Sequence, residues 1–149
     1  MLKINRQTDY AVRVLLALAK QGEGARLSSS EIQREMLIPI ALMPRIVAQL
    51  ARAGLVNTFP GREGGLMLPR PAAQITLRDV VEAFEGPILL SECLQAKNED
   101  DCPFRINCPV SPKWGRVQVA MLREMAAITF ESLAQEALTA PLKVPSMIM

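Results

Sequence analysis

The chain has 149 residues, half of them hydrophobic, which is enough to bury one sound core and carry an additional arm. No apolar run of signal-peptide length opens the sequence, and no segment approaches the ~18 apolar residues of a membrane span, so we expect a cytoplasmic protein without a membrane partner. Histidine is absent, which excludes histidine-based triads, and there is no P-loop or dinucleotide-binding glycine motif, so we do not expect an enzyme.

The charges are unevenly divided along the chain. Residues 1–70 hold ten Lys and Arg against five Asp and Glu, whereas residues 71–149 hold seven against ten. The basic first half is a modest electrostatic signal for a polyanion such as DNA. It needs a DNA-binding motif to support it.

A first helix is predicted from about Asp9 to Gln21, with Thr8 as N-cap, Asp9 in the first turn and Gly22 as the stop. Its apolar residues cover two sides of the helix: Ala11, Val12, Val14, Leu15, Leu16, Leu18 and Ala19. Both faces therefore need cover. Two interpretations fit this pattern. The helix is either buried entirely within its own domain, or it packs on one side against that domain and on the other against a second subunit.

Two short helices follow, joined by a tight turn. Serines suited to an N-cap precede a helix over Ser29–Met36, and Pro39 marks its end. The second helix is predicted to start around Leu42, so that Pro44 lies in its tolerant first turn, and to end near Ala53. Such a pair is typical of helix-turn-helix proteins, and also of other small helical domains.

A β-hairpin is predicted after these helices. Leu55–Phe59 and Leu66–Leu68 are strand candidates, and PGREGG between them supplies turn residues with Arg62 near the tip. A recognition helix followed by a hairpin indicates a winged helix. Arg62 can enter a narrow minor groove while the helix lies in the major groove, or it can be a solvated turn residue.

The second half is predicted to hold a coupling helix and a dimerisation arm. Thr76 caps LRDVVEAFEG, which Gly86 and Pro87 end. A long helix from about Lys113 carries more apolar surface than one small domain covers, which favours a homodimer: Trp114, Val117, Met121, Leu122, Met125 and Ile128. Thr129 then caps a last turn or two ending near Leu138, before a weakly ordered tail.

All three cysteines lie between these two helices. Cys93, Cys102 and Cys108 are separated by gaps of eight and five residues and can converge on one metal centre if the loop is compact. A disulfide leaves one thiol over, and a closed zinc site lacks its fourth ligand in a chain without histidine. This favours an iron-sulfur cluster completed by an oxygen ligand. Reduced thiols in a surface loop remain the alternative on spacing alone.

The predicted fold class is mostly α with a small β-wing: a winged helix-turn-helix domain plus a long C-terminal dimerisation helix. We expect three parts. Residues 1–86 form the DNA-binding domain with its coupling helix, residues 87–112 the cysteine-containing sensor loop, and residues 113–149 the dimerisation helix and tail.

Taken in order, these segments resemble one family over nearly the full length: the bacterial winged-helix transcriptional regulators that include IscR, NsrR and CymR. TDYAVRVLLALA is similar to its first helix, EIQREMLIPIALMPRIVAQLARAGLV to its helix-turn-helix, GREGGLML to its wing, ITLRDVVEAFEGP to its fourth helix and ITFESLA to the end of its arm. The resemblance implies a homodimer with crossing long helices that binds double-stranded DNA at a palindromic operator.

The resemblance also implies a sensor. In many members three cysteines hold a 2Fe-2S or 4Fe-4S cluster, and Cys93, Cys102 and Cys108 occupy those places. This predicts a repressor that senses redox state, nitric oxide or iron-sulfur status. The alternative is a cluster-free repressor of the same family that responds to a metabolite or to thiol oxidation. Ser111 stands where one branch has a histidine ligand, and Asp9 matches the aspartate of another branch. Asp9 of the other subunit is therefore predicted as fourth ligand; the alternative is a carboxylate that only stabilises the start of its helix.

DNA contacts are predicted on both halves of the winged helix. Arg45 on the recognition helix and Arg62 on the wing are the expected principal contacts. The complete predicted set is Ser29, Ala41, Leu42, Arg45, Arg62, Gly64 and Gly65. Pro44 and Pro60 depart from the polar residue and the arginine that the family often has there, so the operator sequence is not inherited from the resemblance.

Overall fold

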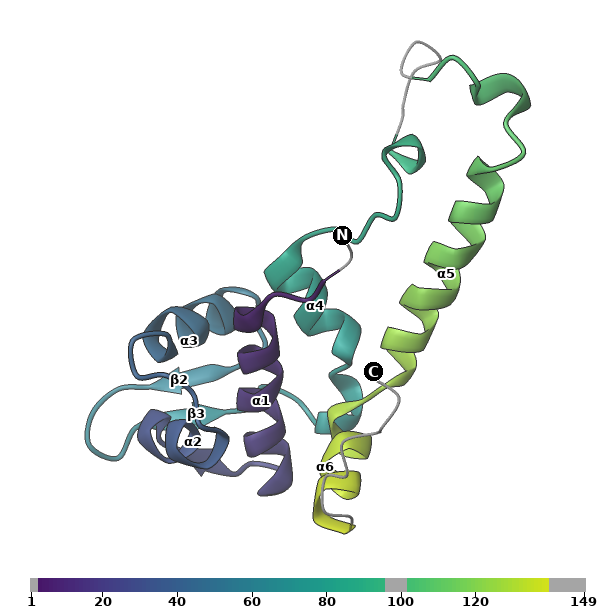
Figure 1. Ribbon diagram of the computed structural model, residues 1–149. Helices are drawn as coiled ribbons and strands as arrows, with labels where there is room; N and C mark the ends of the chain where they lie inside the picture. The colour runs from purple at the N-terminus through teal and green to yellow at the C-terminus, as the bar shows by residue number, and fades with distance from the viewer. Residues whose placement is uncertain (1–2, 96–101, 140–149) are drawn as a thin grey trace.

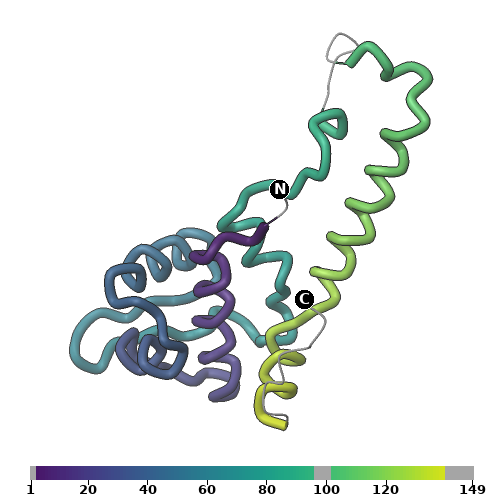
Figure 2. The backbone as a smooth tube through the Cα atoms, viewed as in Figure 1, coloured from purple at the N-terminus to yellow at the C-terminus, as the bar shows by residue number. Residues whose placement is uncertain are grey.

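The computed structural model describes residues 3–95 and 102–139, and the predicted tail beyond residue 139 lies outside the described residues. A winged-helix domain at one end is joined to a long arm that runs away from it (Figure 1). The tube in Figure 2 shows the same division, with the chain leaving the domain, turning at the far end of the arm and returning. The predicted fold class, mostly α with a small β-wing, is confirmed.

The first helix, α1 (Arg6–Lys20), starts three residues before the predicted position. Asn5 is its N-cap, and the Asn5 side chain accepts a hydrogen bond from the Gln7 amide at 2.6 Å. The prediction of Thr8 as N-cap is wrong. Thr8 is instead fully buried inside the helix, where its hydroxyl donates to Oε1 of Glu85.

The helix-turn-helix has the predicted form. Helix α2 (Ser29–Met36) begins with a capping box in which Ser28 and Glu31 bond each other's backbone amides. These bonds from Ser28 hold the pKa of the Glu31 carboxyl below its usual value. Helix α3 (Met43–Arg52) follows, with Pro44 in the first turn as predicted, where the missing N–H costs nothing.

The wing is a three-stranded antiparallel sheet in the order β1-β3-β2, and β1 was not predicted. Its strands are β1 (Arg26–Leu27), β2 (Asn57–Phe59) and β3 (Gly65–Met67). β2 begins two residues later than predicted because the Leu55 amide donates to the Leu50 carbonyl at 2.9 Å. That bond, with Gly54 at φ 71°, closes the end of α3 and keeps Leu55 out of the strand.

Within residues 3–95 and 102–139, three further helices and three 3₁₀ turns follow. Helix α4 (Leu77–Glu85) is capped by Thr76 and ended by Gly86, as predicted. Helix α5 (Ser111–Ala127) starts two residues early because Lys113 and Trp114 both donate to the Val110 carbonyl. The last helix is α6 (Phe130–Thr139), and the 3₁₀ turns are η1 (Ala72–Gln74), η2 (Glu92–Leu94) and η4 (Arg105–Asn107). No helix in the described ranges has the length and apolar character needed to cross a membrane.

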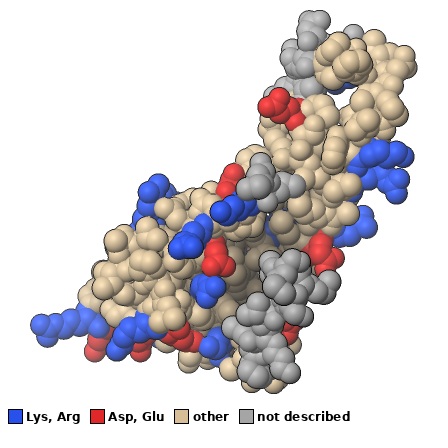
Figure 3. Space-filling model, viewed as in Figure 1, with Lys and Arg blue, Asp and Glu red and all other residues tan. Residues whose placement is uncertain are grey.

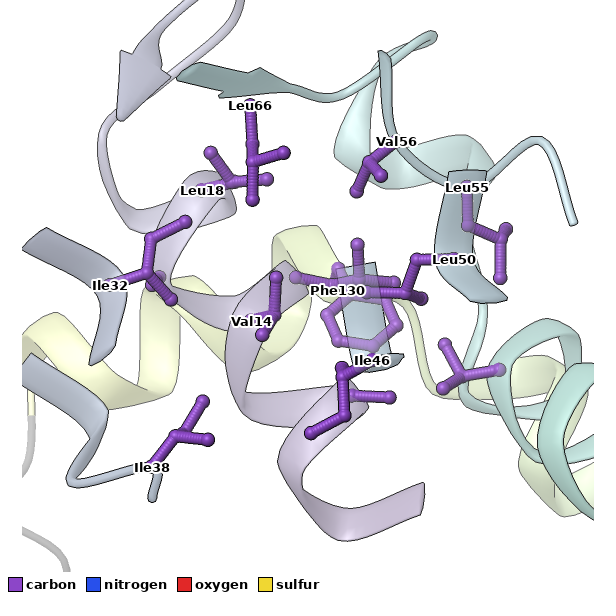
Figure 4. Packing of buried hydrophobic residues seen from close by; sticks show 14 of the residues in the cluster. Val14, Leu18, Ile32, Ile38, Ile46, Leu50, Leu55, Val56, Leu66 and Phe130 are labelled. Carbon is purple, nitrogen blue, oxygen red and sulfur yellow. The ribbon is translucent and has the colours of Figure 1, made fainter. Parts of the chain in front are cut away.

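The C-terminal helix contributes to the core of the winged-helix domain. Phe130 is fully buried and lies among α1, α3 and sheet residues in Figure 4. Thr129 caps α6 by accepting a hydrogen bond from the Ser132 amide, as predicted, but the helix is ten residues long rather than a turn or two. The Leu77 amide donates to the Ile128 carbonyl, and the Phe130 amide donates to the Ile75 carbonyl. These two hydrogen bonds hold the start of α6 beside the start of α4.

Candidate nucleic-acid interface and thiol pocket

Helix α3 buries one face and exposes the other. Met43, Ile46 and Leu50 point into the core and are at most 4% exposed. The opposite stripe, exposed along its length, recurs at helical spacing: Ala41, Pro44, Arg45, Ala48 and Arg52. The first turn of α3 contains no acidic residue, so its free N–H groups and positive dipole end suit a phosphate.

The wing presents Arg62 to solvent and keeps its shape through glycines. A Cβ on Gly64 would overlap the Phe59 carbonyl oxygen, and one on Gly65, at φ 138°, would lie 2.6 Å from the Leu27 carbonyl oxygen. The hairpin therefore needs both glycines whether or not they contact DNA. Arg26 lies over the Phe59 ring at 3.7 Å and donates to the Glu63 carbonyl, a support for the wing that sequence reasoning missed.

The other predicted DNA-contacting residues are accessible. Ser29 is exposed at the first turn of α2, and Leu42, the N-cap of α3, is half-buried. Figure 3 shows Lys and Arg side chains on the winged-helix part, with Asp and Glu among them, and further Lys and Arg along one edge of the arm. Their role in DNA binding stays a prediction.

The three cysteines gather at the far end of the arm. Cys93 lies in η2, Cys102 follows the undescribed part of the loop, and Cys108 ends η4. All three thiols are free and half-buried, and all three line one open pocket of about 950 Å³. Trp114, from the first turns of α5, also lines this pocket. The three thiols thus share one pocket lining, and their predicted role as metal ligands stays a prediction.

Ser111 connects two of the thiols. Its hydroxyl lies 3.6 Å from Sγ of Cys93, and its amide donates to Sγ of Cys108 at 3.4 Å. The Ser91 hydroxyl lies 3.0 Å from Sγ of Cys93. Hydrogen bonds from Ser91 and then Ser111 lower the pKa of the Cys93 thiol, because they stabilise the thiolate.

The donor set of the pocket fits an iron-sulfur cluster in kind. Three thiolates are soft ligands, and the chain offers no competing imidazole. Among the residues that the structure describes, however, no three His, Cys, Asp or Glu side chains are grouped closely enough to hold a metal ion. The three thiols line the same pocket but are not grouped as a metal site.

Asp9 does not lie in the thiol pocket of its own chain. It is exposed, pairs with Arg13 at 2.9 Å one helical turn later, and lines a shallow hollow at the start of α1. An exposed ion pair of this spacing contributes only a few tenths of a kcal/mol, so Asp9 is readily released to another ligand. Its predicted role in the other subunit's cluster is compatible with this exposure and stays a prediction.

Sequence reasoning missed the serines as partners of the thiols and the link between Thr8 and Glu85. Ser91 lies two residues before Cys93 and Ser111 three residues after Cys108, a flanking pattern visible in the sequence. Glu85, at the last residue of α4, accepts from both the Asn5 amide at 2.8 Å and the Thr8 hydroxyl. It thus joins the end of α4, which leads into the sensor loop, to the start of α1.

Comparison with known proteins gives concordant matches. The model of the Rrf2 family, described as an iron-dependent transcriptional regulator, matches residues 4–136. Protein aau3 of Rhizobium meliloti (strain 1021) is 37% identical over 135 residues, which are 90% of this chain and 86% of that protein. The structure of CymR, the global cysteine regulator of B. subtilis, is similar with a TM-score of 0.71 and 27% identity, covering 91% of this chain and 98% of that one. IscR of T. potens has the same fold, with a TM-score of 0.71 and 19% identity over 95% of this chain and 94% of its own.

Proposed function

Because the chain belongs to the Rrf2 family of DNA-binding transcriptional regulators, we propose that it is a homodimeric repressor controlled by an iron-sulfur cluster in its thiol pocket. The observation that carries this proposal is that Cys93, Cys102 and Cys108 line one pocket at the end of the arm. Members of this family are transcriptional regulators and not enzymes, which agrees with the prediction from the sequence.

DNA binding is assigned to α3 and the wing. The exposed face of α3, with Arg45, enters the major groove, where an arginine reads guanine through two hydrogen bonds. Arg62 at the wing contacts the neighbouring backbone or minor groove. Two copies related by a two-fold axis then read a palindrome, with half-sites spaced by about one helical turn or a multiple of it.

The arm supplies the dimer interface. Val110, Trp114 and Val117 are 45–52% exposed, and with Met121 they recur at spacings of four, three and four residues along one side of α5. A surface of this kind is normally covered in the working protein. A second copy of α5 that crosses this stripe covers the apolar stripes of both subunits, as the resemblance to the family implies.

The cluster is held by the three cysteine thiolates, with Asp9 of the partner subunit as the fourth ligand. When bound, the cluster supplies a site that reacts with oxidants or nitric oxide. The chain's own residues do the rest. Hydrogen bonds from Ser91 and Ser111 lower the pKa of the Cys93 thiol, which favours the thiolate that binds iron. Glu85 bonds the start of α1 from the end of α4 and so connects the loop to that helix. A change at the pocket thereby reaches the helix that packs against α2 and α3.

A second candidate, a cluster-free thiol switch, is favoured by one contact. Ser111 contacts the thiols of both Cys93 and Cys108, and in this candidate function these two cysteines form a disulfide after oxidation. Cys102 is then left over.

One experiment separates the two candidates. Protein is reconstituted anaerobically with iron and sulfide, and its visible absorption and iron content are measured beside C93A, C102A and C108A. The proposal predicts a coloured wild type and loss of the chromophore in each variant. A colourless wild type that still binds a selected operator, and forms a Cys93–Cys108 disulfide on mild oxidation, would establish the thiol switch instead.

A further inference from the structure

The turn before the recognition helix and the first turn of that helix expose apolar side chains, and we infer that these side chains read the methyl groups of thymines in the operator. This inference rests on the proposed DNA-binding function and specifies what that site recognises. The surface consists of Ile40, Ala41 and Pro44, next to Arg45. We call the three apolar residues, Ile40, Ala41 and Pro44, the reading surface.

The exposure of the reading surface is a property of the fold. Ile40 is 74% exposed in the turn that leads into α3, although its neighbour Ile38 is only 2% exposed. The Leu42 amide donates to the Pro39 carbonyl at 3.0 Å, and this bond fixes the turn that holds Ile40 out. This ordered turn leaves the large β-branched side chain of Ile40 largely uncovered by the residues that the structure describes.

The reading surface lacks the groups that recognise most base edges. Asn and Gln read adenine, and Asp and Glu read cytosine, but Ile40, Ala41 and Pro44 offer no such side chain. Gln49, the amide on α3, is turned inward and donates to the Ala83 carbonyl at 3.2 Å. What remains is Arg45 for guanine and apolar contact for the thymine methyl, which no other DNA base carries.

The charged residues around the reading surface favour DNA as its ligand. Arg45 and Arg52 lie on the same stripe of α3, and the exposed Arg34 lies in the last turn of α2. The acidic groups of α2 are already engaged. Glu31 accepts from the Ser28 amide, and Glu35 is paired with Lys20. A basic rim around an apolar centre is complementary to a major groove lined by phosphates and thymine methyls.

The size of the side chains permits close approach. Ala41 and Ala48 project little from α3, and Pro44 has a compact ring without an N–H to satisfy. The helix can therefore come near enough to the base edges for Ile40 to touch a methyl group. Each contact of this kind buries about one CH₂ equivalent, which corresponds to about fourfold in affinity.

The test uses an operator obtained by selection from random DNA, resynthesised with deoxyuridine in place of thymine at one position at a time. Deoxyuridine removes only the methyl group and keeps every hydrogen-bonding atom of the base. Affinities are measured at fixed salt for wild type, I40A and L37G. Leu37 is the matched control, because it is an 84% exposed apolar residue of the same turn but lies outside the reading surface. It adopts φ 53°, which glycine also tolerates.

The inference predicts that wild type loses about fourfold or more in affinity at one or more half-site positions when thymine becomes deoxyuridine. I40A should bind the two operators equally at that position, and L37G should discriminate like wild type. Specific binding with equal affinity for thymine and deoxyuridine everywhere would overturn the inference and leave the proposed function standing. Loss of discrimination in L37G as well would assign the effect to the turn rather than to Ile40. Failure to select any specific sequence would overturn the proposed function itself.

Discussion

Ser111 is the residue through which the thiol pocket is organised. Its backbone amide begins α5 and bonds Cys108, while its hydroxyl reaches Cys93, so one residue ties both thiols to the arm. The resemblance to the family drew attention to this position because a histidine ligand is replaced there. The structure shows that the serine bonds two of the thiols. The spacing of the cysteines in the sequence could not predict these contacts.

Replacing Ser111 with Ala should raise the pKa of the Cys93 thiol toward its usual value, because one of the two hydrogen bonds that stabilise the thiolate is lost. We expect slower alkylation of Cys93 by iodoacetamide near neutral pH and an unchanged rate at alkaline pH, where the thiol is ionised in both proteins. Peptide mass spectrometry measures the rate at each cysteine. Cys102, which has no hydrogen bond to Ser111 among the described contacts, is the internal control, and an equal slowing at Cys102 would contradict the assignment.

A substitution of Phe130 tests whether α6 packs in the core of the winged-helix domain. Its side chain is fully buried, so F130A should lower the free energy of unfolding by about 3–5 kcal/mol. Phe104 is 73% exposed in the sensor loop, and F104A should change it by less than about 0.5 kcal/mol. Urea denaturation followed by circular dichroism compares the two. Similar, small effects of both changes would show that α6 does not pack in the core.

At the scale of elements, local signals predicted well and pairings over long sequence distances did not. The bounds of α2, α3 and α4 were predicted closely from the sequence. Their start and stop signals lie at the helix ends themselves: Ser28, Pro44, Thr76 and Gly86. β1 is only two residues long and exists through pairing with β3 some forty residues later. The burial of Phe130 likewise depends on a distant contact that helical periodicity does not reveal.

The start of α1 shows the same distinction. Thr8 is a good N-cap by residue type, yet its hydroxyl donates to Glu85, and the helix begins at Arg6 with Asn5 as its N-cap. The cysteine gaps led us to expect three thiols that converge on one metal centre. The structure places the three along one pocket, and no three His, Cys, Asp or Glu side chains of the described residues are grouped as a metal site.

The link between α4 and α1 can be tested by removing Glu85. E85A leaves the buried Thr8 hydroxyl without its acceptor, and we expect it to cost about 1–3 kcal/mol of unfolding free energy. Amide hydrogen exchange should quicken in the first turn of α1. E82A removes an exposed i,i+4 pair with Arg78 from the same helix and should cost only about 0.3–0.5 kcal/mol. Equal effects of the two variants would remove Glu85 from its coupling role.

At the scale of the molecule, the arm is incomplete as a single copy. Helix α5 has no fully buried residue along its 17 residues, although it carries valines, methionines and a tryptophan. It contacts its own chain mainly through α4 and η2. The remaining apolar stripe is the surface on which we place the second subunit.

Val117→Glu should convert the dimer to a monomer, because it buries a charge in the interface stripe. Val119→Glu is the control, since Val119 is 55% exposed on the other side of the same helix and should leave the dimer intact. Sedimentation equilibrium distinguishes the two species. A dimeric V117E, or a V119E that dissociates equally, would place the interface elsewhere.

The most direct test of regulation by the thiol pocket is the operator affinity of one protein preparation measured with its cluster and again after the cluster is removed anaerobically. Coupling between two sites is typically worth 5–150-fold, and we predict a change of about tenfold or more in the wild type. C93A, C102A and C108A should show a single affinity that treatment does not alter. Equal affinities of the cluster-bound and cluster-free wild type, in a preparation that demonstrably holds the cluster, would contradict the claim that the pocket controls DNA binding.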